Sequence, residues 1–243
     1  MKTCLYILPT NFEHEGINIK VNGQLQVLYK KFKTSLVYIH YKRHSSLLLK
    51  LLAYFRFEYH SIWLSFFKHI IYCRYNPKSI FVNLWLVLLS YLKPIYIEHN
   101  TIMDTELKFL NRYIEWQLHC ATLFLFRFSR CKHIAVNNEL KNHLIQKKLK
   151  SVIYAQNGYS KQAVDNSTIP TNLQHKLATF KSHYSKLAIF CGNGYPWHGC
   201  KEIINLFSKH PEIGLVIVGP YSNINTKQCL QFNFLPSSTL SFI

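Results

Sequence analysis

Short apolar segments and longer amphipathic segments alternate along most of the chain. The apolar segments predict strands over residues 3–8, 35–39, 95–97 and 133–136, with another strand beginning at Val152. Helices are expected to end near residue 31, to cover 46–57, 62–71 and 80–92, to form one long helix or a pair over 105–130, and to begin at Asn137. Strands that alternate with helices are typical of a parallel sheet wrapped by helices.

The same pattern returns near the C-terminus. A strand is expected over 187–191, a polar loop over 193–198, a helix opening at Gly199, and a second strand over 215–219. Ile203, Ile204 and Phe207 would share one face of that helix. Glycines at the turn from strand to helix expose backbone N–H groups, which favour a phosphate. An ordinary strand–helix–strand unit without a ligand explains the pattern equally well, because the full dinucleotide fingerprint is absent.

A polar stretch separates these two regions. Residues 1–160 are expected to form an N-terminal Rossmann-like domain with one open parallel sheet, and residues 161–185 a linker. Residues 186–243 would then belong to a second, incomplete Rossmann-like domain, whose strand–helix–strand piece does not pair with the first sheet. The expected fold class is α/β, with a cleft between the two domains.

Composition narrows the possible partners. Lys and Arg number 29 against 11 Asp and Glu, a formal net charge of +18, which attracts phosphorylated molecules and anionic membranes. The basic residues are scattered and no nucleic-acid-binding motif is present, so nucleic acid is not an expected partner. Seven widely spaced cysteines without a Cys-x-x-Cys pair predict reduced thiols in the cytoplasm. The histidines lack metal-ligand spacing, so no metal site is expected.

Two apolar segments could be mistaken for targeting or membrane segments. Residues 1–9 are too short for a signal peptide and lead directly into a polar loop. Residues 80–92 are too short to span a bilayer and predict a buried helix.

Several short motifs, taken in order, resemble the group 1 family of retaining glycosyltransferases, which has the GT-B architecture of two facing Rossmann-like domains. No single motif is specific, but their order and spacing match over nearly the whole chain. The matching segments are Gly16-Ile-Asn-Ile-Lys20 with Gly23-Gln24, Ile97-Glu-His-Asn-Thr101, Ile134-Ala-Val-Asn-Asn-Glu-Leu140, Asn157-Gly-Tyr159, residues 190–199, and Leu215-Val-Ile-Val-Gly-Pro220.

This resemblance implies a set of site residues. His99 would lie beside the reacting sugar as the catalytic residue, and the loops that bind donor and phosphate would contain Gly16, Gly192, Asn193, Gly194, His198 and Gly199. Asn193 and His198 stand where the family has an arginine and a lysine. Two alternatives remain: His198 as a loop histidine without a ligand, and His99 as a strand-end histidine that caps a helix. We expect Gly16, His99 and Gly194 to converge on one interdomain crevice.

The implied function is transfer of a sugar from a nucleotide-diphosphate sugar, which is the substrate, to a lipid-linked acceptor of a growing surface polysaccharide. No cofactor is expected. The protein would be cytoplasmic, and its charge would suit peripheral contact with the anionic inner face of the membrane. Residues 213–243 contain no Asp or Glu, whereas members of the family continue well past the second strand of the C-terminal domain to two glutamates that contact the donor. The C-terminal domain is therefore expected to be truncated, and the alternative function is an inactive remnant that at most binds a ligand or a partner.

Overall fold

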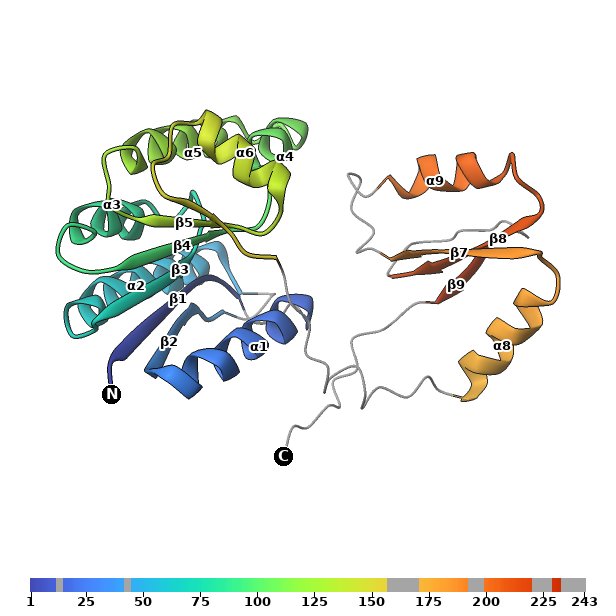
Figure 1. The fold of residues 1–243 in the computed structure, drawn as a ribbon, viewed down its shortest axis with the longest axis horizontal. Helices are drawn as coiled ribbons and strands as arrows, with labels where there is room; N and C mark the ends of the chain where they lie inside the picture. Colours follow the sequence, from blue (N-terminus) through green and yellow to red (C-terminus); the bar gives the residue numbers. More distant parts are fainter. Residues whose placement is uncertain (12–14, 42–44, 157–170, 192–198, 220–228, 233–243) are drawn as a thin grey trace. The chain divides into compact units, whose positions relative to one another are not determined.

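A computed structural model describes residues 1–11, 15–41, 45–156, 171–191, 199–219 and 229–232 (Figure 1). The chain divides into two compact units, Met1–Ser160 and Lys161–Ile243. Each unit has a sheet with only parallel strand pairs. The predicted α/β fold class is confirmed. No helix in the described ranges is both long enough and apolar enough to cross a bilayer.

The first unit is built on a six-stranded sheet with the strand order β2-β1-β3-β4-β5-β6. Parallel pairing places the carboxyl ends of all six strands at one edge, where α/β folds bind their ligands. The strands are β1 (Thr3–Asn11), β2 (Lys33–Ile39), β3 (Ile70–Arg74), β4 (Ile95–His99), β5 (Lys132–Ala135) and β6 (Val152–Tyr154).

Helices cover both faces of this sheet, as Figure 1 shows. Alternate residues of β1 point to opposite faces: Tyr6 and Leu8 pack against α1, whereas Leu5 and Ile7 belong to the larger core under α2, α3, α5 and α6. The helices of this unit are α1 (Glu15–Lys31), α2 (Leu47–Phe66), α3 (Ile80–Leu89), α4 (Met103–Phe109), α5 (Tyr113–Phe126) and α6 (Asn138–Gln146).

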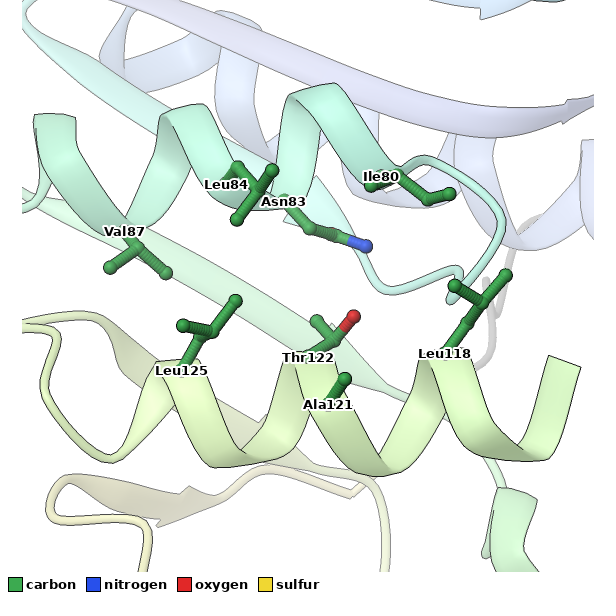
Figure 2. A pocket seen from close by; sticks show the side chains of 8 residues that line it. All are labelled: Ile80, Asn83, Leu84, Val87, Leu118, Ala121, Thr122 and Leu125. Atoms are coloured by element: carbon green, nitrogen blue, oxygen red, sulfur yellow. The ribbon is translucent and has the colours of Figure 1, made fainter. Parts of the chain in front are cut away.

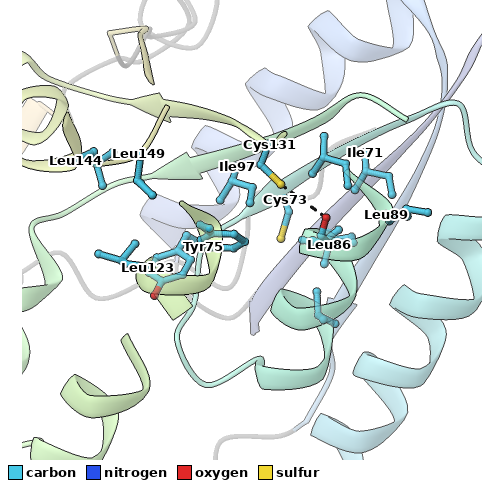
Figure 3. Packing of buried hydrophobic residues seen from close by; sticks show 14 of the residues in the cluster. Ile71, Cys73, Tyr75, Leu86, Leu89, Ile97, Leu123, Cys131, Leu144 and Leu149 are labelled. Atoms are coloured by element: carbon cyan, nitrogen blue, oxygen red, sulfur yellow. Dashed lines mark hydrogen bonds between the residues drawn. The ribbon is translucent and has the colours of Figure 1, made fainter. Parts of the chain in front are cut away.

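The larger core joins the central strands to α3 and α5 (Figure 3). Ile71 and Ile97 from the strands pack with Leu86 and Leu123 from the helices, and all four side chains are buried. Each such aliphatic side chain contributes about 1.5–3 kcal/mol by leaving water. The core therefore fixes β3 and β4, whose carboxyl ends form the candidate site.

The first unit departs from the sequence prediction in two places. Residues 62–71, predicted as one helix, contain the end of the continuous helix α2 and the start of strand β3. Residues 105–130, predicted as one long helix or a pair, form the pair α4 and α5. Strand β1 continues past Pro9 to Asn11, with an irregular register after Leu8. The irregularity accommodates Pro9, which has no backbone N–H to donate to the neighbouring strand.

The second unit has a three-stranded parallel sheet with the order β7-β8-β9. Leu215 and Ile217 of β8 are buried against the predicted apolar face of α9. Strand β7 pairs with β8 and not with the first sheet, so the predicted separate strand–helix–strand piece is confirmed. The elements are α8 (Thr171–Lys181), β7 (Lys186–Cys191), α9 (Cys200–Phe207), β8 (Ile213–Val218) and β9 (Cys229–Phe232). Helix α8 lies inside the predicted linker, and β9 was not predicted.

Gly214 lies where the second unit leaves no room for a side chain. A Cβ atom added there would lie 2.7 Å from Tyr184 and 2.8 Å from both Leu187 and Phe180. We expect Gly214→Ala to destabilise the second unit by about 1–3 kcal/mol, because three side chains must move at once. Hydrogen exchange of the β8 amides in the full chain measures this loss.

Gly23 offers a matched control for the added methyl group. It lies inside α1, and nothing lies within 4 Å of a Cβ added there. Gly23→Ala should stabilise α1 by up to about 1 kcal/mol through helix propensity. Unchanged exchange of β8 in Gly214→Ala would show that the packing around Gly214 is looser than the structure indicates.

Candidate functional site

The carboxyl edge of the first sheet holds two polar clusters, one on each face. Strand β4 supplies both, because neighbouring residues of a strand point in opposite directions. Glu98 points to the face covered by α1, where its carboxylate contacts Lys20. His99, the next residue, points to the opposite face, where its ring contacts His133.

The cluster on the α1 face is centred on Glu98. Lys20 Nζ lies 2.5 Å from Glu98 Oε1 and also donates to Asn100 Oδ1. Gln24 Nε2 donates to Glu98 Oε2 at 2.7 Å, and the Tyr72 hydroxyl donates to the same oxygen. The Glu98 side chain is only 2% exposed, whereas that of Lys20 is 19% exposed. The cluster therefore holds a buried carboxylate and a lysine that is still open to solvent.

In the pair of Lys20 and Glu98, each charge offsets part of the cost of burying the other. Burial alone would raise the pKa of Glu98, but Lys20 and the hydrogen bonds from Tyr72 and Gln24 outweigh it and hold that pKa below its usual value. Burial lowers the pKa of Lys20, and the attraction of Glu98 opposes this shift. The pair thus pins the first half of α1 to the end of β4.

The cluster on the opposite face contains buried histidines. His99 Nε2 lies 3.0 Å from His133 Nδ1, and the ring of Tyr75 packs against His99 with centroids 4.8 Å apart. The Tyr75 hydroxyl lies 2.8 Å from His119 Nδ1. Burial lowers the pKa of His99 well below its usual value and lowers the pKa of His119 and of His133 to about 4. These three rings are therefore neutral at physiological pH.

Asp104, near the start of α4, anchors the outer side of this histidine cluster. Its Oδ2 lies 2.8 Å from Lys147 Nζ and 2.9 Å from His143 Nε2, while Trp116 Nε1 donates to Oδ1 at 3.0 Å. Burial would raise the pKa of Asp104, but Lys147, His119 and Trp116 outweigh it and lower that pKa to about 2. In the described ranges, no three His, Cys, Asp or Glu side chains are arranged to hold a metal ion.

The predicted site residues of the first unit do not come together on one face. Gly16 was expected in the loop after β1, but it lies in the first turn of α1. That helix covers the face opposite to the one that holds the His99 ring. His99 is buried and hydrogen-bonded to His133. This environment is typical of a structural histidine.

In the second unit, Gly199 is the one predicted site residue that falls within the described ranges. It precedes the first residue of α9 with φ +65°, a left-handed conformation that glycine adopts without strain. Gly192, Asn193, Gly194 and His198 lie outside the described residues. The expected position of Gly194 in the site stays a prediction.

The family resemblance predicted His99 as a site residue, but it did not predict a role for the neighbours Glu98 and Asn100, nor for Lys20 and Gln24. The alternation of side chains along β4 indicates the position of Glu98. Ile95 and Ile97 point to the larger core, so Glu98 must point to the other face, beneath the helix that follows β1. A carboxylate placed there needs a cation, and Lys20 is the basic residue in the first half of that helix.

Comparison with known proteins supports the fold. The chain matches no protein-family model and no curated protein sequence. Among solved structures, it is similar to HepE from Anabaena in complex with UDP and glucose, with a TM-score of 0.62 and 13% identity, over 97% of this chain and 70% of HepE. It is also similar to the UDP-GlcNAc 2-epimerase from Neisseria meningitidis bound to UDP-GlcNAc, with a TM-score of 0.55 and 14% identity, over 96% of this chain and 72% of the epimerase. At this identity the likeness establishes a GT-B-like fold.

Proposed function

We propose that this chain is a retaining glycosyltransferase that moves a sugar from a nucleotide-diphosphate donor to a lipid-linked acceptor of a growing surface polysaccharide. The observation that carries the proposal is the fold likeness over 97% of the chain to a protein crystallised with UDP and glucose. The motif order in the sequence and the net charge of +18, which suits anionic substrates, agree with it.

The second unit is the proposed donor side. Gly199 turns the chain into α9, and the first N–H groups of this helix have no partner within the helix, so they can face a phosphate. During transfer the bond between the sugar and the diphosphate breaks, and negative charge accumulates on the leaving group. Donors fixed in advance stabilise that charge without reorganising. The segment before α9, with Gly192, Asn193, Gly194 and His198, is the proposed place for them.

The first unit is the proposed acceptor side. Lys20 has three N–H donors, of which Glu98 and Asn100 accept two. A third donor can serve a hydroxyl or phosphate oxygen of the acceptor at the carboxyl edge near Gly16. His99 would act as a positioning residue, because its ring holds the end of β4 through His133 and so places Asn100.

A second candidate function is epimerisation of a UDP-sugar. It is favoured by the likeness, with a TM-score of 0.55, to an epimerase bound to UDP-GlcNAc. Both reactions begin with the same class of ligand, so binding of UDP does not separate them. A UDP-sugar with a radiolabelled sugar separates the two reactions. Transfer moves the label to a membrane acceptor, whereas epimerisation leaves it on a nucleotide sugar.

The donor side is tested by Gly199→Ala. Forcing a residue with a Cβ into the left-handed conformation costs about 1–2 kcal/mol, so binding of UDP should weaken about tenfold if the turn forms the phosphate site. Calorimetric titration of the full chain with UDP, UDP-glucose and UDP-GlcNAc measures the change. Gly23→Ala adds the same methyl group in the first unit and should leave the affinity unchanged.

Four outcomes test the proposed function. Binding together with transfer of label supports the proposed function, and binding without turnover supports an inactive chain that only binds. If the wild-type chain binds none of the three nucleotides at millimolar concentration, the proposal is wrong. Equal affinities of wild type and Gly199→Ala would remove the turn before α9 from the donor site.

A further inference from the structure

The outward face of α2 is apolar, which is the reverse of an ordinary surface helix. Six of its large exposed side chains recur every three or four residues, so they form one stripe along the helix, and Leu47, Leu49 and Leu51 near its start are exposed as well. Arg56 and His60 are the polar residues among the exposed positions of α2, and the inward face packs on the sheet. The stripe consists of Leu48, Leu52, Phe55, Tyr59, Trp63 and Phe66.

Helix α3 continues this surface. Phe66 of α2 packs against Trp85 of α3 with ring centroids 4.9 Å apart, so the two helices are in contact. The outward side chains of α3, Phe81, Leu84 and Leu88, are exposed as well. Figure 2 shows an apolar groove between α3 and α5, with Leu84 and Val87 on one wall and Leu125 on the other. The exposed face thus extends over two helices and ends in a groove.

The segment that contains α2 and α3 is basic. Residues 45–94 contain six Lys and Arg side chains and a single acidic residue, Glu58, and Lys78 of this segment is paired with Glu115 of α5. Glu58 is buried, so it does not face solvent with the stripe. Arg56 is exposed beside Phe55 and Tyr59. A cationic surface that presents Trp, Tyr, Phe and Leu matches an anionic lipid interface, where aromatic rings and aliphatic chains enter the headgroup layer.

We propose that the outward faces of α2 and α3 form a docking surface for an anionic lipid bilayer, on which the chain lies without spanning it. This inference extends the proposed function, because a lipid-linked acceptor is presented at a membrane, but lipid binding can be measured without any sugar substrate. A second copy of the chain fits the same face less well. Two copies would bring cationic surfaces of equal sign together, at a net charge of +18 each.

Vesicle binding of a matched pair of double variants tests the proposal. Phe55 and Trp63 on α2 are 60% and 54% exposed, whereas Val27 and Tyr29 on α1, which covers the other face of the sheet, are 59% and 53% exposed. The probe is phosphatidylcholine vesicles with about 30% phosphatidylglycerol, the anionic lipid supplying the negative surface potential. We expect F55E/W63E to bind at least tenfold more weakly than wild type, and V27E/Y29E to bind as wild type does.

Charge is tested separately with Arg56→Gln, which leaves the apolar stripe intact. This variant should bind the anionic vesicles about fivefold more weakly, the effect of one basic residue at such a surface. Wild type should bind pure phosphatidylcholine more weakly than the mixture, and high salt should weaken binding to the mixture. Circular dichroism of each variant checks that the helices remain folded.

The proposal is overturned if wild type does not bind the anionic vesicles, or if both double variants lose binding equally. Sedimentation velocity adds a further outcome. A wild-type dimer that dissociates in F55E/W63E, with no vesicle binding in either protein, would identify the face as an interface between copies. Failure of vesicle binding with intact binding of UDP would overturn this inference and leave the proposed function standing.

Discussion

Replacing Lys20 by methionine should destabilise the first unit by about 3–5 kcal/mol, the usual cost of leaving one charge of a buried pair without its partner. Glu98 is 2% exposed and accepts from Lys20, Gln24 and Tyr72. Without the lysine, its carboxylate must either stay charged in the interior or take up a proton. Hydrogen exchange of the β1, β3 and β4 amides in the full chain measures the loss.

A surface pair provides the matched control. Lys78 Nζ lies 3.1 Å from Glu115 Oε1, with side chains 43% and 22% exposed. Lys78→Met should cost about 1 kcal/mol or less, because solvent screens this pair. The double variant K20M/E98Q removes both buried charges and should recover part of the stability lost in Lys20→Met. Equal costs for Lys20→Met and Lys78→Met would show that the Glu98 cluster does not anchor α1.

The sequence predicted the sheet well where the strands are apolar and bounded by polar residues. Residues 3–8, 35–39 and 133–136 all lie within or overlap strands β1, β2 and β5. Strand β3 was missed although Lys68 and His69 separate it from α2, because the short apolar segment that begins at Ile70 does not by itself distinguish a helix from a buried strand. Helix α8 was missed because most of its sequence is polar, although Leu173, Leu177 and Phe180 recur at helical spacing.

The site was harder to predict than the fold. His99 was predicted as a site residue at the end of a strand. Because side chains alternate along β4, its ring points to the larger core, whereas Glu98 points toward α1. The contact between Lys20 and Glu98 joins residues 78 positions apart, so it follows only once β4 is placed next to the helix after β1. Local pattern alone does not supply this placement.

Acidification from about pH 6.5 to pH 4 should destabilise the first unit, with His119 and His133 each contributing up to about 3 kcal/mol. Both have a pKa of about 4 in the folded protein because they are buried. The unfolded chain therefore binds protons at these two residues, and at His99, whose pKa burial also lowers, in that window while the folded chain does not, and stability falls as the pH falls. The stability that depends on ionised Asp104, whose pKa is about 2 in the folded protein, is lost only below this window. Urea denaturation at a series of pH values measures the slope.

His133→Leu separates this effect from general acid destabilisation. Between pH 6.5 and pH 4 the unfolded wild-type chain binds one proton at His119 and one at His133. Leucine at position 133 binds none, so the slope of stability against pH should decrease. Tyr75→Phe is the matched control, since it removes the hydrogen bond to His119 but no histidine. It should lower stability at every pH without changing the slope in this way. Burial of Glu58 raises the pKa of its carboxyl group, which acts in the opposite direction and is the same in both variants. An unchanged slope in His133→Leu would show that the buried ring of His133 is protonated in the folded protein.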